Sequence, residues 1–300
     1  MAAALLCGGF AAGCSAGSSP AAPALSDADL RTELTGGEKA LLHLAEQRLI
    51  ADCMDEQGFR YVVEELPRSS TSPRAAGASR QGDVAWARAN GYGTAPGDAA
   101  SGQGKRTLGP NGRYIASLTP EKQRAFSRAL DGTNPSAVSV EVPTLGRVFT
   151  SADGCQADAR TRLYGDQARW VRAKATVTNL RAITREDFSS DPEYTAALSE
   201  WRSCMAERGH SARTPAEARR TALSKRAPAT GAATVSAVER RTAVADARCS
   251  RSTRLATVTE RVEERHVRAA ARGAQRGAAE DYTVAVTRAL DLAQEPSGAG

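Results

Sequence analysis

Cysteine is the residue of this 300-residue chain whose chemistry is easiest to specify. Two of the six cysteines lie in an apolar N-terminal run, and four are spread through the rest of the chain: Cys53, Cys155, Cys204 and Cys249. An even number outside a leader favours two structural disulfides. Zinc ligands and free reactive thiols are the alternatives. No Cys-x-x-Cys occurs, however, and the three His are not paired at ligand spacing. We therefore expect disulfides and no metal site.

An internal repeat indicates how these cysteines pair. Residues 53–59 (CMDEQGF) match residues 204–210 (CMAERGH) at the Cys, Met, Glu and Gly positions. Each copy follows a helical apolar pattern, and its Gly fits the left-handed residue just past a helix end. A second cysteine follows each copy, near the expected start of a helix, at Cys155 and Cys249. The repeat predicts that the first copy is cross-linked to Cys155 and the second to Cys249.

The apolar N-terminal run ends at Cys14, directly after the small residues 11–13 (AAG). Residues 15–26 that follow are only small residues, Pro and one Leu. This order is typical of a bacterial lipoprotein signal, in which the cysteine takes the lipid, although residues 1–13 lack the usual Lys or Arg. The alternative is an unstructured Ala/Gly-rich terminus. We expect export and anchoring to the outer face of the cell membrane through a lipid on Cys14.

Composition predicts a mainly α fold. Hydrophobic residues make up 41% of the chain but aromatic residues only 5%, so the core is expected to be thin and rich in alanine. We expect a helical bundle-like body with a long C-terminal helix, an irregular Gly/Pro/Ser-rich insertion at 67–112, and two disulfides. The predicted organisation has four regions. A signal covers 1–14 and a tether 15–28. The first Cys-Met repeat with the insertion covers 29–150, and a helical region with the second repeat covers 151–295.

Capping residues and apolar periodicity place the elements. Helices are expected over 38–57, 120–131, 152–187 with a break at 165, 192–208, a short stretch from 215, and 236–294 with weak points at 273 and 277. The alternating residues 138–142 predict a strand or an extended connector, and residues 59–66 a short strand or an extended exit.

The net charge is +6, and residues 237–276 hold ten Arg against five acidic residues. Leu255, Val258 and Val262 predict the apolar stripe of this helix, which His266 extends as a structural residue. The arginines are candidate contacts with an anionic surface: Arg248, Arg251, Arg254, Arg261, Arg265 and Arg268. An exported chain would meet anionic wall polymer or another envelope protein, and we expect no nucleic acid. A solvated helix face is the alternative.

Motifs for catalysis do not emerge. The sequence contains neither Gly-x-Ser-x-Gly nor His-Glu-x-x-His. Residues 102–107 (GQGKRT) depart from a phosphate-binding loop, because Ala99 replaces its first Gly and Arg106 its Ser or Thr. The sequence therefore predicts no catalytic residue and no cofactor.

Several motifs in a fixed order resemble a known family. They are 53–61 (CMDEQGFRY), 111–114 (NGRY) ahead of 118–120 (LTP), 154–155 (GC) ahead of 163–166 (LYGD), and 201–205 (WRSCM). Over roughly residues 38–260 the chain is similar to uncharacterised secreted lipoproteins of actinobacteria. The resemblance implies an envelope location and a helical, disulfide-bonded body, and it brings no known activity or ligand.

The leading hypothesis is a non-catalytic, lipid-anchored envelope protein that binds or scaffolds another component. One alternative is an enzyme acting on wall or extracellular polymer, which needs two carboxylates facing one cleft. Another is a ligand-binding lipoprotein, which would be supported by paired lobes of alternating strands and helices.

Overall fold

The computed structural model describes the chain in four ranges: residues 25–66, 82–93, 108–224 and 235–295. The predicted signal, most of the tether and parts of the predicted insertion lie outside these ranges. Within them the fold is mainly α, as predicted, with a single hairpin of strands.

The helices, in chain order, are α1 (Gly36–Glu56), α3 (Val84–Asn90), α5 (Pro110–Ser117), α6 (Pro120–Asp131), α7 (Cys155–Tyr164), α8 (Gln167–Thr178), α9 (Leu180–Ile183), α10 (Arg185–Ser190), α11 (Pro192–Glu207), α12 (Pro215–Leu223), α13 (Ala237–Ser252), α14 (Leu255–Arg272) and α15 (Arg276–Gln294). The strands β1 (Val138–Val142) and β2 (Gly146–Thr150) are antiparallel, with Val140 opposite Val148.

One group of elements, called here the first lobe, consists of α1, α5, α6, the hairpin, α7, α8 and α15. α15 packs against α8, α7 and α1, and the hairpin lies on α8. Three stacked rings run through its core: Tyr164 lies 3.9 Å from Trp170, and Trp170 lies 5.8 Å from Tyr282, between ring centroids. This stack joins the middle of the chain to its C-terminal helix.

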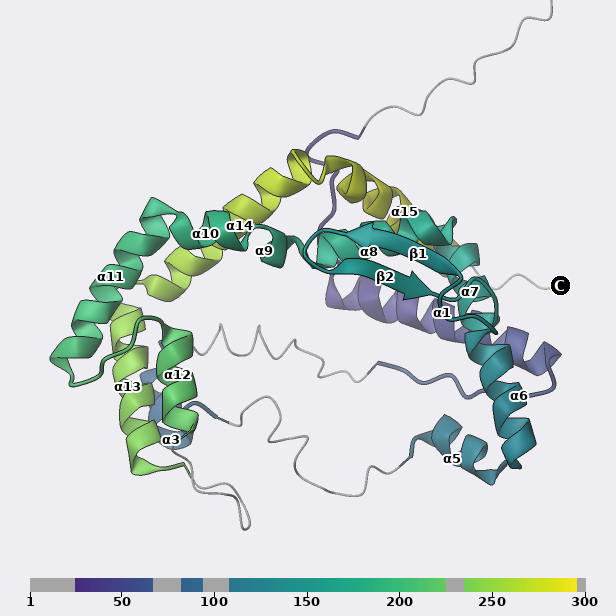
Figure 1. The fold of residues 1–300 in the computed structure, drawn as a ribbon, viewed down its shortest axis with the longest axis horizontal. Helices are drawn as coiled ribbons and strands as arrows, with labels where there is room; N and C mark the ends of the chain where they lie inside the picture. The colour runs from purple at the N-terminus through teal and green to yellow at the C-terminus, as the bar shows by residue number, and fades with distance from the viewer. Residues whose placement is uncertain (1–24, 67–81, 94–107, 225–234, 296–300) are drawn as a thin grey trace, which may run out of the picture.

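The second lobe consists of α3, α11, α12 and α13. Its core surrounds Trp201 and Met205, both fully buried. α14 packs against α11 at one end and against α15 at the other, so it connects the two lobes in an arch (Figure 1). The helix α3 precedes residue 150 but belongs to the second lobe, and α15 follows residue 150 but belongs to the first lobe. The two lobes therefore differ from the two regions predicted on either side of residue 150.

The described chain enters the fold where α14 meets α15. Leu25 O accepts a hydrogen bond from the Arg276 guanidinium, which also pairs with Asp27. Further along, the Arg31 N–H donates to Thr283 Oγ1 at 2.9 Å. The N-terminal end of the described chain is therefore fixed at the apex of the arch (Figure 1).

Small side chains dominate the interior. In the described ranges, fourteen of the 34 buried apolar residues are alanine, which confirms the alanine-rich core that composition predicts. Alanine buries little area but allows helices to approach closely, so each helix pair contributes less apolar burial than a Leu-rich interface would. The cross-links between helices matter correspondingly more.

The two copies of the Cys-Met repeat end their helices in the same way. Gly58 and Gly209 are left-handed, with φ of 75° and 76°. The Phe59 N–H donates to Met54 O at 2.8 Å, and in the second copy the N–H of residue 210 donates to the Met205 carbonyl at 2.9 Å. Each Gly N–H also donates to the carbonyl three residues before it. The two bonds together form a Schellman cap, which confirms the predicted helix ends.

The disulfides join the predicted partners. Cys53 bonds Cys155 with an S–S distance of 2.00 Å, and Cys204 bonds Cys249 with 2.06 Å. Cys155 is the first residue of α7, as expected. The expectation that Cys249 also lies near a helix start is wrong, because α13 begins at Ala237 and places Cys249 in its last turn. Both disulfides nevertheless tie a Cys-Met helix to another helix of the same lobe.

Several boundaries differ from the sequence-based expectations. The helical stretch 152–187 breaks at Gly165, as predicted, but is divided again at Asn179 and Thr184. The stretch 236–294 breaks near Gly273, as predicted, and also before Arg254, whose φ is 54°. A left-handed Arg has no signature in apolar periodicity. The helix α3 lies within the predicted irregular insertion, α5 begins in its last residues and runs on to Ser117, and the partner strand β2 was not predicted.

Residues 59–66 form an extended exit rather than a strand. The Val62 N–H donates to Asn111 Oδ1 at 2.8 Å, and Asn111 Nδ2 donates to Val62 O at 2.8 Å. The Asn111 amide thus bonds both backbone groups of Val62, as a neighbouring strand would.

Replacing either pair of cysteines with serine should lower the free energy of unfolding. Chain-entropy estimates give about 5 kcal/mol for the 102-residue separation of Cys53 and Cys155 and about 4 kcal/mol for the 45-residue separation of Cys204 and Cys249. Urea unfolding of each double variant measures the loss. An unfolding midpoint equal to that of the unreduced parent would contradict the predicted loss of stability. A non-reducing peptide map that joins Cys53 to Cys204 would contradict the pairing of the cysteines.

Candidate functional site

The six predicted surface arginines divide into two groups. Arg248 and Arg251 lie on α13, and Arg254 lies in the break that follows. The remaining three lie along α14, where Leu255 and Val262 form the buried stripe, as predicted. Because α13 and α14 are separate helices, the six side chains do not form one continuous face.

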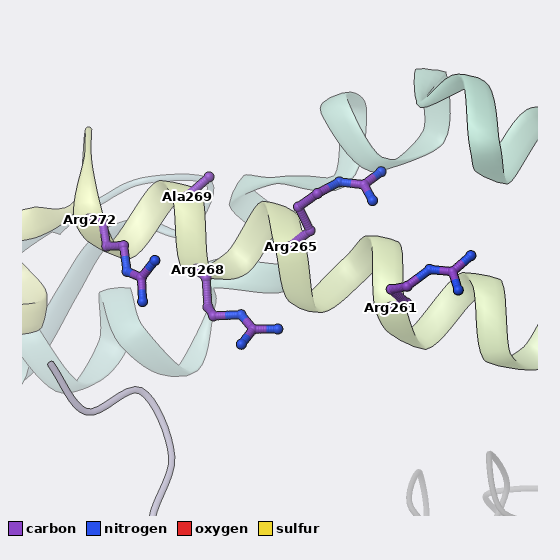
Figure 2. A pocket seen from close by; sticks show the side chains of 5 residues that line it. All are labelled: Arg261, Arg265, Arg268, Ala269 and Arg272. Atoms are coloured by element: carbon purple, nitrogen blue, oxygen red, sulfur yellow. The ribbon is translucent and has the colours of Figure 1, made fainter. Parts of the chain in front are cut away.

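The α14 arginines line a shallow, open hollow of about 450 Å³ together with Ala269 and Arg272. Arg268 and Arg272 project to one side of the helix and Arg265 to the other, as Figure 2 shows. The hollow is therefore a strip along a convex helix rather than an enclosed cleft.

Carboxylates accompany every arginine of this hollow. Arg265 lies 2.8 Å from Asp191 and 3.1 Å from Glu193, which also pairs with Arg261. The other two partners are Glu264, 3.1 Å from Arg268, and Asp27, 3.9 Å from Arg272. The positive charge that an anionic ligand would meet on α14 is thus reduced by acids already in place.

The outer side of α13 carries a different arginine surface. Four exposed arginines follow it at spacings of seven and eleven residues, which bring them onto one side of the helix. We call them the α13 arginine face: Arg240, Arg241, Arg248 and Arg251. Within the described ranges none of them forms an ion pair. Sequence reasoning missed Arg240 and Arg241, although their spacing to Arg251 and Arg248 was a usable signal.

The acids of α13, Glu239 and Asp246, are buried on the inner side of the helix. Glu239 lies two positions before Arg241, and Asp246 lies two positions before Arg248. Two positions correspond to a rotation of about 200° around the helix axis. The helix therefore separates its charges, with acids facing the core and arginines facing solvent.

Asp246 holds the second lobe together by accepting three hydrogen bonds. Trp201 Nε1 donates to Oδ1 at 3.0 Å, Ser250 Oγ donates to the same oxygen at 3.2 Å, and Tyr92 OH donates to Oδ2 at 3.0 Å. These donors come from α11, from α13 and from the turn after α3. All three are uncharged, so the carboxylate has hydrogen bonds without a cationic partner among them.

Glu239 completes the attachment of α3, because it accepts a hydrogen bond from the Tyr92 N–H at 3.0 Å. The side chain is fully buried. Tyr92 is therefore bound twice to α13, through its ring hydroxyl and its backbone. Ser236 caps α13, since its Oγ accepts a hydrogen bond from the Glu239 N–H, while the Glu239 side chain accepts from Tyr92.

Burial raises the pKa of the Asp246 carboxyl and outweighs the three hydrogen bonds, which act in the opposite direction. The pKa of Asp191 is lowered, chiefly by its hydrogen bonds from Arg265 and His266. His266 Nε2 lies 2.9 Å from Asp191 Oδ2, and the histidine side chain is half-buried. The two acids therefore respond to pH in opposite directions.

The remaining candidate groups are dispersed. Ring nitrogens of His43 and His210 lie near Glu64 O at 2.7 Å and Thr242 Oγ1 at 3.4 Å, on different elements. In the described ranges no three His, Cys, Asp or Glu side chains are grouped so as to hold a metal ion.

Asp246→Asn should change how stability depends on pH. Because the folded-state pKa is raised, the contribution of Asp246 is greatest below the unfolded pKa and is lost as pH rises through the folded value. The parent should therefore lose free energy of unfolding relative to Asp246→Asn as pH rises above the ordinary pKa of Asp, about 4, towards the raised folded-state pKa. Urea unfolding between about pH 5 and pH 8 measures the difference.

Asp153→Asn is the matched control. Hydrogen bonds from Thr133 lower the pKa of its carboxyl, so its stabilisation is present above the unfolded pKa and is lost only as pH falls through the lower folded value. The difference between this variant and the parent should stay constant over the same pH range. Parallel profiles for the parent and Asp246→Asn would contradict the assignment of the buried carboxyl.

The described part of the chain thus holds one neutralised arginine surface, on α14, and one without ion-pair partners, on α13. None of its helices is long and apolar enough to cross a membrane. No protein-family model, curated protein or solved structure matches the chain.

Proposed function

We propose that this protein is exported and anchored by lipid at Cys14, and that its helical body binds or scaffolds another component of the cell envelope without catalysis. The observation that carries the proposal is the pair of disulfides. All four cysteines of the body are cross-linked within their own lobes. Such bonds form and persist in oxidising compartments, which lie outside the cytoplasm.

The point where the described chain begins fits an anchor. Leu25 lies at the junction of α14 and α15, eleven positions after Cys14. That length spans at most about 40 Å when fully extended. A lipid on Cys14 would hold the apex of the arch near the membrane and leave both lobes accessible to other envelope components.

The site chemistry fits binding better than turnover. Asp246 is closed over by Trp201, Tyr92 and Ser250, so it serves to join helices. The hollow along α14 is open and lined by arginines that are already paired. A surface of charged helices suits a partner that lies against it.

The mass of the protein isolated from its own cells tests export, lipidation and oxidation together. We expect a mature chain that begins at acylated Cys14 and gains the mass of four hydrogens on reduction, two for each disulfide. A chain that retains Met1 and gains no mass on reduction would overturn the proposed location.

Cys14→Ser tests the anchor by itself. The variant should move from the detergent phase to the aqueous phase when membranes are partitioned in detergent, because one acyl-bearing cysteine supplies the attachment. Cys7→Ser is the matched control and should stay in the detergent phase. Equal partitioning of the Cys14 variant and the parent would refute lipidation at this residue.

A further inference from the structure

We propose that the α13 arginine face binds a linear polyanion of the cell wall, which lies lengthwise along the helix. The proposal rests on the envelope location proposed above and names the class of partner. It begins from charge. The face presents four exposed guanidinium groups, and the two acids of the same helix are buried on its other side.

The contrast with α14 shows that this charge is available. An anion that approaches Arg265 or Arg268 must compete with Asp191, Glu193 or Glu264, which lie within 3.1 Å. Arg241 and Arg248 have no such competitor in the described ranges. Guanidinium groups also bind phosphate and carboxylate oxygens in pairs, which suits a polymer that carries either group.

The geometry selects an extended ligand. Arg241 and Arg248 are two helical turns apart, about 10 Å, while Arg240 and Arg251 are three turns apart, about 16 Å. Two hollows of the described surface lie along α14 and between α11 and α14, and no arginine of the α13 face lines either of them. A compact anion would meet one end of the α13 face, whereas a polymer with repeated charges would meet both ends together.

The backbone of α13 is fixed before any ligand binds. Cys249 ties it to α11, Asp246 ties it to Trp201 and Tyr92, and α3 and α12 pack on two further sides. Only side-chain freedom is lost on binding, so the spacing of the arginines is preorganised.

The position of the face favours wall polymer over the bilayer. The described chain enters at the α14–α15 junction, and the 18 residues of α14, about 27 Å, lie between that point and α13. Because the tether enters at the junction, the junction lies nearer the attachment point than the α13 face does when the body stands away from the bilayer, although the full length of the tether, about 40 Å, exceeds that of α14. The helix α13, which carries the face, lies at the far end of α14 (Figure 1).

The test uses the full chain with Cys14→Ser, oxidised and in solution, and titrates it with long-chain inorganic polyphosphate. Arg241→Gln/Arg248→Gln should weaken binding about tenfold, since an exposed ion pair contributes roughly two- to fivefold. The slope of affinity against salt should also fall by about 0.7 for each arginine removed. Arg261→Gln/Arg268→Gln removes the same charge from α14 and should change binding by less than about twofold.

Two further probes distinguish a linear polyanion from a compact anion and from a membrane surface. Tripolyphosphate should bind at least tenfold more weakly per molecule than the polymer. Vesicles of phosphatidylglycerol should bind the parent and the α13 variant equally.

Equal weakening by the two double variants would overturn the proposal, because net charge rather than the α13 face would then control binding. Loss of vesicle binding in the α13 variant alone would overturn the choice of polymer over membrane. Neither result depends on the lipid anchor, whereas a native mass that retains Met1 would refute the proposed location and leave the binding result standing.

Discussion

The scarcity of large apolar side chains is the constraint on which this fold depends. With fourteen alanines among 34 buried apolar residues, packing alone gives each helix pair little burial. A disulfide lies within the core of each lobe, where Cys155 and Cys249 are at most 1% exposed. Cys155 packs with Met54 and Phe126, and Cys249 packs with Trp201 and Met205. Each cross-link begins from the same helix-ending Cys-Met unit.

In the second lobe, buried hydrogen bonds also join helices that bury little apolar area. Asp246 gathers three helical elements through hydrogen bonds that an apolar residue could not make. Burying the carboxyl costs stability, as its raised pKa shows. In return only one arrangement of Trp201 and Tyr92 satisfies the buried oxygens, so the cluster favours a single packing. The inward acids also leave the outward side of α13 positively charged.

Much of the fold could be predicted because its signals are local. Thr119 and Asp191 cap helices directly, and the Cys-Met-x-Glu-x-Gly unit encodes a Schellman cap twice. The disulfide partners followed from that repeat. The left-handed Arg254 was missed because nothing in its neighbours demands the break, which depends on how α13 and α14 pack.

The candidate site was predicted less well, because it depends on which residues meet across the fold. The sequence indicated that α13 and α14 are rich in arginine, but not that Asp191 and Glu193 would neutralise the second group. Tyr92 comes from a stretch predicted to be mostly irregular, 154 positions from Asp246. No periodicity along the chain could have revealed that contact.

The entry of the chain at the α14–α15 junction also decides how the molecule carries tension. A pull on the N-terminal end first loads the contacts of Asp27 with Arg276 and of Arg31 with Thr283. Residues 25–35 form no helix, and Leu30 and Leu34 pack against the core beside these contacts, so this segment yields before the cross-linked helices do. The load then reaches α1, which the Cys53–Cys155 bond joins covalently to α7. Residues 25–35 thus form a short extensible segment in series with a cross-linked body, so a stretched tether would lengthen there while the α13 face keeps its shape.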